Sequence, residues 1–167
     1  EGPTIIGNTF NFGGQNGDRQ IVRTSSGVLY AVLTDSTNSA VTVWKYNGSS
    51  WSQMDGVDSP LGSTNHQSIA IDSSNVIHIV YDNLGSPTDL YYTTFLTSTD
   101  QFGTPELAYN MTIGNGLSDY GLAIDSSDIP HVVFFEDGVA SSDLVRYINR
   151  IGGNWAIITV ETVTTSA

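Results

Sequence analysis

The stretch IAIDSSNVIHIVY at residues 69–81 decides the fold, because it recurs 53 residues later as LAIDSSDIPHVVF at residues 122–134. Seven of the thirteen positions are identical, and most of the others exchange one apolar residue for another. A more distant copy, VRTSSGVLYAVL at residues 22–33, keeps the Ser-Ser turn and has Tyr30 where the later copies have a histidine. Self-similarity with a period near 50 residues predicts a protein built from structural repeats.

The segments that follow each copy recur as well. A second apolar segment lies at residues 41–46, 89–95 and 143–148, and a short fourth segment closes the later units at 106–109 and 156–161. A turn with an aromatic residue just beyond it separates the third segment from the fourth. This turn is found at Gly48-Ser-Ser-Trp51 and Gly152-Gly-Asn-Trp155, with Phe102 as a weaker counterpart.

The pattern of segments therefore predicts four antiparallel strands in each unit, joined by tight turns, with the second strand central and buried on both faces. No long stretch has helical periodicity. Four strands in about 50 residues are typical of a propeller blade. We expect an all-β fold of the β-propeller type, with three tandem four-stranded antiparallel blades in one domain. The predicted boundaries are an N-terminal strand at 1–16 and blades at 17–62, 63–115 and 116–167.

The repeated motif carries a resemblance to a known family. The run Ala-Ile-Asp-Ser-Ser-Asx, then His-x-Val-aromatic, Asp-Leu-x-Tyr and Gly-x-x-Trp, resembles the repeats of bacterial and phage-type β-propellers in the sialidase-like superfamily, over residues 17–162. The resemblance implies blade architecture and leaves the function open, because such propellers serve as lectins, adhesins, virion parts and enzymes.

The resemblance also allows a test for enzymatic activity. A sialidase of this family needs three arginines, a Tyr/Glu pair and an acid Asp, and Arg19 stands in a segment similar to the one that carries the first arginine. Outside that segment, which also contains Arg23, only Arg146 and Arg150 remain, both in one predicted strand, so the set is incomplete, and the Asp-box order is absent. We therefore expect a non-enzymatic protein.

Three blades leave two outer faces uncovered, whereas propellers typically close with four to eight blades. Three solutions remain open: the chain is a fragment, two chains pair as three plus three blades, or the units pack differently. The segment Thr4–Phe12 is a candidate strap for closure. We expect completion by other chains or by further sequence.

The composition excludes several classes of partner. The chain has 17 acidic and 5 basic residues, giving a net charge of -12, so nucleic acid and anionic membranes are poor partners. No apolar run approaches the roughly 18 residues that cross a bilayer, which predicts no membrane insertion. There is no cysteine. We expect an extracellular or virion-surface location, with self-association or other surface proteins as partners.

Histidines and turn acids are the candidates for metal binding. His78 and His131 lie at equivalent positions without a ligand partner at metal-binding spacing, which favours packed strand histidines with a hydrogen-bonded tip. Asp72 and Asp125 in the Asp-Ser-Ser-Asx turns favour turn capping over calcium, because a bidentate Glu and alternating acids are missing. We expect no metal site and no cofactor, with calcium as the alternative.

Carboxylates collect on the loops between second and third strands, and propeller ligands usually bind on that face. Trp51 and Trp155 recur with the turn, which predicts a structural role, whereas an isolated aromatic can stack on a sugar. The predicted ligand-binding residues are Trp44, Asp35, Asp82, Glu136 and Asp137.

These observations predict a structural or binding module, acting in a virion-surface or cell-surface assembly and recognising glycans. The alternative is a fragment of a propeller glycoside hydrolase, similar to a sialidase, whose remaining blades carry the missing residues. Glu136 is the one plausible catalytic carboxylate for that alternative.

Overall fold

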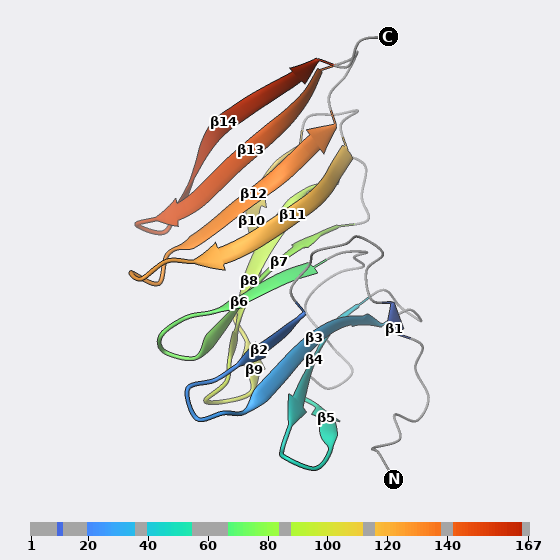
Figure 1. Ribbon diagram of the computed structural model, residues 1–167, viewed down its shortest axis with the longest axis vertical. Coiled ribbons are helices and arrows are strands. Elements are labelled where there is room, and N and C mark those ends of the chain that lie inside the picture. The colour runs from blue at the N-terminus through green and yellow to red at the C-terminus, as the bar shows by residue number, and fades with distance from the viewer. Residues whose placement is uncertain are drawn as a thin grey trace.

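The computed structural model of the chain describes residues 10–11, 20–35, 40–54, 67–83, 88–111, 116–137 and 142–164. Within these residues the chain forms β-strands and no helix, and the strands make three antiparallel sheets that follow one another along the molecule (Figure 1). The prediction of an all-β antiparallel fold is confirmed. No helix of the described chain is long and apolar enough to span a membrane.

The three sheets are built from consecutive parts of the chain. The first sheet contains β1 (Phe10–Asn11), β2 (Ile21–Arg23), β3 (Leu29–Asp35), β4 (Val41–Tyr46) and β5 (Trp51–Gln53). The second contains β6 (Gln67–Ile71), β7 (Val76–Asp82), β8 (Leu90–Leu96), β9 (Gln101–Phe102) and β10 (Glu106–Tyr109). The third contains β11 (Gly116–Ile124), β12 (Pro130–Asp137), β13 (Ser142–Ile151) and β14 (Asn154–Thr164).

The second strand of each repeat is central in its sheet, as the sequence predicts. β3 pairs with β2 and β4, β7 with β6 and β8, and β12 with β11 and β13. β7 is buried along its length from Ile77 to Asp82, whereas β12 alternates between buried and more exposed residues. The difference arises because the second sheet has a neighbour on each face, and the third sheet has a described neighbour on one face only.

The Asp-Ser-Ser-Asx turns are capped by their own side chains. Asp72 accepts hydrogen bonds at Oδ1 from the backbone N–H groups of Ser74 and Val76, over 2.9 and 2.7 Å. Asp125 makes the same two bonds with Ser127 and Ile129. The predicted turn-capping role of both aspartates is confirmed.

The fourth residue of each later turn also reaches back to the preceding sheet. Asn75 accepts a 2.6 Å bond from the backbone N–H of Ser25, and Asp128 accepts bonds from the backbone and the hydroxyl of Ser73. Both residues have positive φ, at 63° and 61°. The bonds from Ser73 lower the pKa of Asp128 below its usual value. These bridges fix neighbouring sheets at their turn ends.

Apolar side chains fill the two junctions between sheets. We call the face that packs on the next sheet along the chain the forward face, and the opposite one the back face. One cluster joins the forward face of the first sheet to the back face of the second, and another joins the forward face of the second to the back face of the third. The forward face of the second sheet carries Ala70, His78, Val80 and Tyr92, and its back face carries Ile69, Ile77, Ile79, Tyr81 and Phe95.

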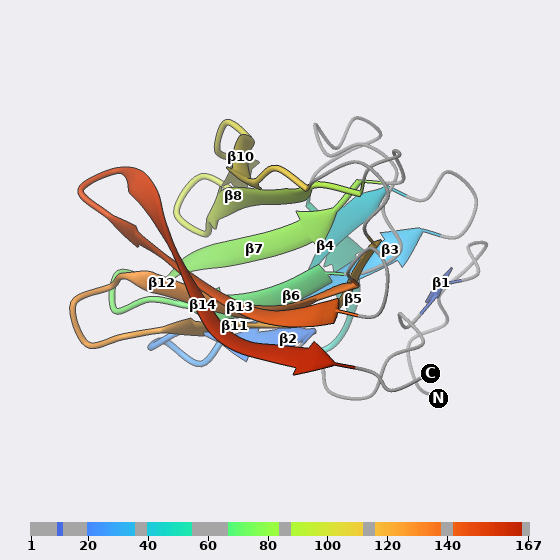
Figure 2. The ribbon, with the colours of Figure 1, turned by 90° about the horizontal axis from the view of Figure 1, so that it is seen from above.

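The described strands do not close into a ring. In the ribbon views no described strand lies against the forward face of the third sheet (Figure 1 and Figure 2). Of the predicted strap, Phe10 and Asn11 pair with Asp35 and Thr34 of β3. Residues 4–9 and 12 lie outside the described residues. The propeller type therefore remains a prediction, and the blade-like succession of sheets is what the structure contains.

Candidate functional site

An acid, a base and an indole meet on the seam between the second and third sheets. Arg150 near the end of β13 donates from Nε and Nη2 to the two carboxylate oxygens of Glu106 at the start of β10, over 2.5 and 3.1 Å. Trp155 in β14 donates its indole N–H to Glu106 Oε1 over 2.8 Å. We call Glu106, Arg150 and Trp155 the seam cluster.

The local sequence explains how two members of the seam cluster come together. Arg150 and Trp155 are cross-strand partners beside the turn of the β13–β14 hairpin. Gly152 and Gly153 form that turn with φ of 60° and 84°, a left-handed conformation that glycine adopts without steric cost. Glu106 belongs to another sheet, so the cluster is complete only when the two sheets pack together.

The seam cluster packs on the ring of Tyr92, and its acid and base are partly exposed. Trp155 packs edge-on against Tyr92, with ring centroids 5.2 Å apart, and the Arg150 guanidinium lies 5.8 Å from the same ring. Burial raises the pKa of Tyr92 to about 12, and the bond to Glu106 raises the pKa of Arg150 above its ordinary value. The side chains of Glu106 and Arg150 are 34% and 32% exposed, so both charged groups face solvent.

This arrangement suits a ligand with several hydroxyl groups. A guanidinium has five N–H donors, of which two are used for Glu106, and each carboxylate oxygen can accept more than one hydrogen bond. A half-buried indole beside them offers an apolar surface that pairs with the CH face of a sugar ring. Neutral hydroxyl groups can therefore donate to Glu106, accept from Arg150 and pack on Trp155.

A second acid–base group lies further along the same seam, and its carboxylate is buried. Glu136 in β12 accepts hydrogen bonds at Oε2 from the Tyr109 hydroxyl over 3.0 Å and from Arg146 Nε over 2.7 Å. Arg146 also donates to the Thr159 hydroxyl. Burial, reinforced by the bond to Glu136, raises the pKa of Tyr109. The Glu136 side chain is 1% exposed and that of Arg146 is 20% exposed, so the carboxylate is buried between the sheets and does not reach the surface.

The histidines form a hydrogen-bonded row with a tyrosine and a turn aspartate. His78 Nδ1 lies 2.6 Å from the Tyr92 hydroxyl, which confirms the predicted hydrogen-bonded tip. The expectation that these histidines lack a carboxylate partner is wrong, because His78 Nε2 lies 3.2 Å from Asp72 Oδ2. Six residues of sequence separate the pair, but the turn folds them together. In the third sheet the same positions hold Asp125, His131 and Tyr147.

The described part of the chain contains no group of three His, Asp or Glu side chains that could hold a metal ion. His78 and His131 each have one tyrosine and one aspartate as neighbours, and the aspartates are occupied by backbone N–H groups of their turns. The arrangement therefore stabilises the turn and the sheet face.

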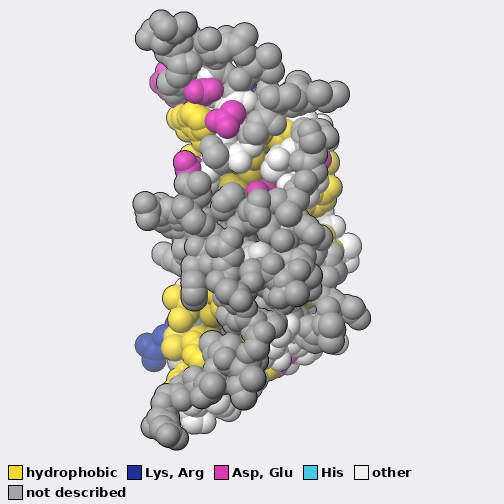
Figure 3. All heavy atoms as spheres, turned by 90° about the vertical axis from the view of Figure 1, so that its right-hand side faces the viewer, with side chains coloured by type: hydrophobic (Ala, Val, Ile, Leu, Met, Phe, Trp, Pro, Cys, Tyr) yellow, Lys and Arg dark blue, Asp and Glu magenta, His cyan; other side chains and the backbone are white. Residues whose placement is uncertain are grey.

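The acidic residues predicted to bind ligand lie at one end of the sheets. Asp35, Asp82 and Asp137 are the last residues of β3, β7 and β12, and Figure 3 looks onto this end, where acidic side chains are visible in its upper part. Asp137 is exposed, the Asp35 side chain lies outside the described part, and Asp82 and Glu136 are buried. The two buried carboxylates cannot touch a ligand at the surface in this structure.

Trp44, the remaining predicted ligand-binding residue, lies on the back face of the first sheet. It is half-buried opposite Ala31 and donates its indole N–H to the Thr42 hydroxyl over 3.1 Å. Asp82 belongs to the second sheet, and Glu136 and Asp137 belong to the third. The structure thus distributes these residues over all three sheets, and a role in ligand binding stays a prediction for Trp44, Asp35 and Asp137.

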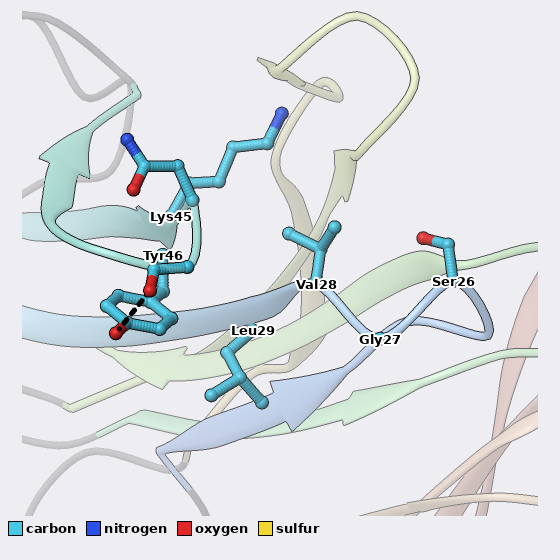
Figure 4. A pocket seen from close by; sticks show the side chains of 8 residues that line it. Ser26, Gly27, Val28, Leu29, Lys45 and Tyr46 are labelled. Atoms are coloured by element: carbon cyan, nitrogen blue, oxygen red, sulfur yellow. Dashed lines mark hydrogen bonds between the residues drawn. The ribbon is translucent and has the colours of Figure 1, made fainter.

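An open hollow of about 490 Å³ lies at the turn end of the first sheet (Figure 4). Figure 4 shows Lys45 and Val28 on one side of the strands and Leu29 pointing to the other. The polar groups here are already occupied, because Lys45 binds Asp100, and the Tyr46 hydroxyl donates to the Gly48 carbonyl. No carboxylate lines the hollow, which makes it a weaker candidate than the seam cluster.

The sequence reasoning missed Glu106 and Arg150 as partners. They are 44 residues apart and belong to different repeats, so no local motif joins them. A signal was present in the repeat itself: Arg150 stands opposite Trp155, where the other repeats have Tyr46 opposite Trp51 and Phe95 opposite Phe102. An arginine in a position otherwise aromatic marks a change of role.

Comparisons with known proteins support the fold. No family model matches the chain, and no curated protein matches it. A solved structure of a protein of unknown function from Dyadobacter fermentans DSM 18053 is similar with a TM-score of 0.51 and 11% identity, over 89% of this chain and 54% of that one. The chain thus spans about half the length of that protein.

A second solved structure is that of a fucose lectin from Kordia zhangzhouensis in complex with methyl-fucoside. It is similar with a TM-score of 0.50 and 13% identity, over 83% of this chain and 95% of the lectin chain. At these identities the likeness concerns the fold alone. The resemblance to sialidase-like repeats stays a prediction, and the chain is similar in fold to these two solved structures, one of them a lectin.

Proposed function

We propose that this chain is a non-enzymatic glycan-binding module that takes neutral, hydroxyl-rich sugars at the seam cluster. The observation that carries the proposal is the geometry of Glu106, Arg150 and Trp155, which offers an acceptor, a donor and an apolar ring side by side at the surface. The chain would act outside the cell, as part of a cell-surface or virion-surface assembly.

The charge state of the seam cluster supports a neutral ligand. Arg150 is already paired with Glu106, so the net charge of the pair is zero and an anionic sugar gains little from it. The chain as a whole carries a net charge of -12, which repels anions further. The similar fold of a lectin solved with methyl-fucoside makes that sugar the first probe to use.

A glycan array is the experiment that tests the proposal. The purified chain is expected to bind a subset of neutral glycans, with fucosylated ones as the first group to inspect. The same glycans are then titrated by calorimetry against wild type and the Glu106→Gln chain, which keeps an acceptor for Trp155 and removes the charge that holds Arg150. We expect at least a tenfold weaker affinity, about 1.4 kcal/mol, for the variant.

Trp51→Phe is the matched control, because Trp51 occupies the position of Trp155 in the first sheet and has Tyr46 in place of an arginine opposite it. Its affinity is expected to stay within about twofold of wild type. Arrays that stay blank for the folded wild type, or equal affinity in the Glu106→Gln chain, would refute the proposed site. Release of free sugar from the bound glycans would refute the non-enzymatic part and favour the glycoside hydrolase reading.

A further inference from the structure

The forward face of the third sheet is apolar and uncovered. Val133 on β12 is 48% exposed, whereas Val80 at the equivalent position of the second sheet is 0% exposed beneath the third sheet. Beside Val133 stand its cross-strand partner Tyr147 and, opposite Tyr147, the exposed Ile158. The described chain places nothing over this surface.

This uncovered face repeats the arrangement of the covered one. Tyr147 binds His131 as Tyr92 binds His78, over 2.6 Å in each pair. His131 Nε2 lies 3.2 Å from Asp125 Oδ2 but makes no hydrogen bond within the described residues. The face of the second sheet that carries this row is an internal junction, so the copy in the third sheet is shaped for the back face of another sheet.

The back face of the first sheet is the matching surface at the other end of the row. Ile21 is 50% exposed, whereas the residues at its position in the later sheets, Ile69 and Leu122, are buried at 0% and 9%. Near the turn end of this face the rings of Tyr46 and Trp51 pack with centroids 5.3 Å apart. These rings occupy the positions of Arg150 and Trp155, which contact the preceding sheet in the third repeat.

The residue types at one pair of equivalent positions are complementary in both junctions, and the residues at these positions on the two free faces are complementary as well. In the first junction the backbone N–H of Met54 donates a hydrogen bond to the Val43 carbonyl, and the Met54 side chain packs against the cluster that contains Phe95. In the second junction the same positions hold Glu106 and Arg150, which form an ion pair. The free faces offer Ile158 at the first of these positions and Tyr46 at the second. Apolar again meets aromatic.

Charge is complementary at the turn end of these faces. Arg23 is exposed on β2 and, within the described residues, has no carboxylate partner. Its Nη2 would lie 3.2 Å from a Cβ atom placed on Gly27, so the arginine occupies the space where a side chain at position 27 would stand. In the later turns that place belongs to Asn75 and Asp128, which reach the turn of the preceding sheet. The corresponding turn of the third sheet carries the negative charge of Asp125, whose Oδ1 caps its own turn and whose side chain is 38% exposed.

We propose that the forward face of the third sheet docks on the back face of the first sheet of a second copy of this chain, and that the reciprocal contact closes the pair into a ring. A head-to-tail contact between identical chains closes when the rotation fits, and here two identical junctions form at once. The seam cluster lies inside one chain, so loss of this docking leaves the proposed glycan site in place.

The experiment measures the mass of the full chain in solution by sedimentation or light scattering. Wild type is expected to have twice the mass of one chain. Val133→Lys and Ile21→Glu each place a charge in both junctions of the pair, and each variant alone is expected to sediment as a single chain. Both residues are exposed in the isolated chain, so the variants keep their fold, which circular dichroism checks.

An equimolar mixture of the two variants is the decisive sample. In a mixed pair one junction is wild type and the other joins the new lysine to the new glutamate, so dimers are expected to return. Leu107→Glu is the matched control, because Leu107 is similarly exposed on β10 outside these faces, and this variant is expected to stay dimeric. Single-chain mass for wild type, dimers in either variant alone, or a mixture that stays monomeric would overturn the proposal.

Discussion

The two junctions between sheets share one geometry and differ in chemistry. Between the first and second sheets, Tyr30 and Phe95 pack with centroids 6.1 Å apart inside an apolar cluster. Between the second and third sheets, the position of Phe95 is taken by Arg150, and the ion pair with Glu106 replaces the apolar contact. Both junctions keep an apolar cluster, and they differ at this pair of positions, where the second junction has partly exposed polar groups that a ligand can use.

The first junction also contains an ion pair, but it has another place. Lys45 Nζ lies 2.8 Å from Asp100 Oδ2, and the Tyr30 hydroxyl donates to the same carboxylate over 3.0 Å. Both charged side chains are about a third exposed at the rim, where such a pair contributes roughly 0 to 1 kcal/mol. Charge alone therefore does not mark the second junction; an arginine in an aromatic position does.

The largest difference between the two junctions is expected when the equivalent side chains Phe95 and Arg150 are each replaced by alanine. Phe95→Ala deletes a fully buried ring, and we expect a loss of about 3–5 kcal/mol in the free energy of unfolding. Arg150→Ala removes a partly exposed side chain whose ion pair is screened by solvent, so a loss of about 1 kcal/mol is expected. Urea denaturation measures both. Equal losses would show that the second junction is as much a packing device as the first.

Replacing the ion pair of the second junction by the residue types of the first tests whether the two junctions are interchangeable. Glu106→Met leaves Arg150 without its partner and is expected to cost about 1 kcal/mol, discounted for exposure. Adding Arg150→Phe recreates the Met54 and Phe95 pairing of the first junction, and the double variant is expected to recover wild-type stability within about 1 kcal/mol. Its glycan binding should be lost. A double variant less stable than the single one would argue against interchangeable junctions.

The smallest effect expected is on acid sensitivity. Burial lowers the pKa of His78 below 6.5, outweighing Asp72 and Asp128, which raise it, while Arg150 lowers it further. Near pH 6.5 the unfolded chain therefore binds a proton at His78, whereas the folded chain does not. The contribution of neutral His78 to the free energy of unfolding is complete above that pH and is lost as the pH decreases toward the pKa of the folded state. The first junction has Tyr30 at this position and lacks this dependence.

NMR titration of the His78 ring, combined with urea unfolding at pH 7.5 and 5.5, measures this effect. His78→Asn is the reference chain, and it is expected to lose part of the stability difference between the two pH values. An unchanged difference in that variant would assign the acid sensitivity to other groups.

The sequence predicted what is local or periodic in this fold. The Asp-Ser-Ser-Asx turns were predictable because Asp72 and Asp125 bond backbone groups two and four residues away. The central place of β7 followed from its apolar run. Trp51 and Trp155 were expected to recur beside the same hairpin turn, and both do, whereas the ligand contact proposed for Trp155 departs from the structural role that the repeat predicted.

The candidate site was not predictable in the same way. Glu106 and Arg150 meet only because two sheets pack, and no spacing rule connects residues on different sheets. Asp82 and Glu136 were predicted as exposed ligand-binding acids, since they stand near loops, but the neighbouring sheet buries them. Burial between repeats depends on tertiary packing, which a pattern along one chain does not contain.

Calorimetric titration of methyl-fucoside, or of the best neutral glycan from the array, into wild type and the Glu106→Gln chain tests the central claim most directly. The account predicts saturable binding to wild type, at least about tenfold weaker binding to Glu106→Gln, and nearly unchanged binding to Trp51→Phe. Equal affinity in wild type and Glu106→Gln, or a loss in Trp51→Phe alone, would contradict it and move the site away from the seam between the second and third sheets.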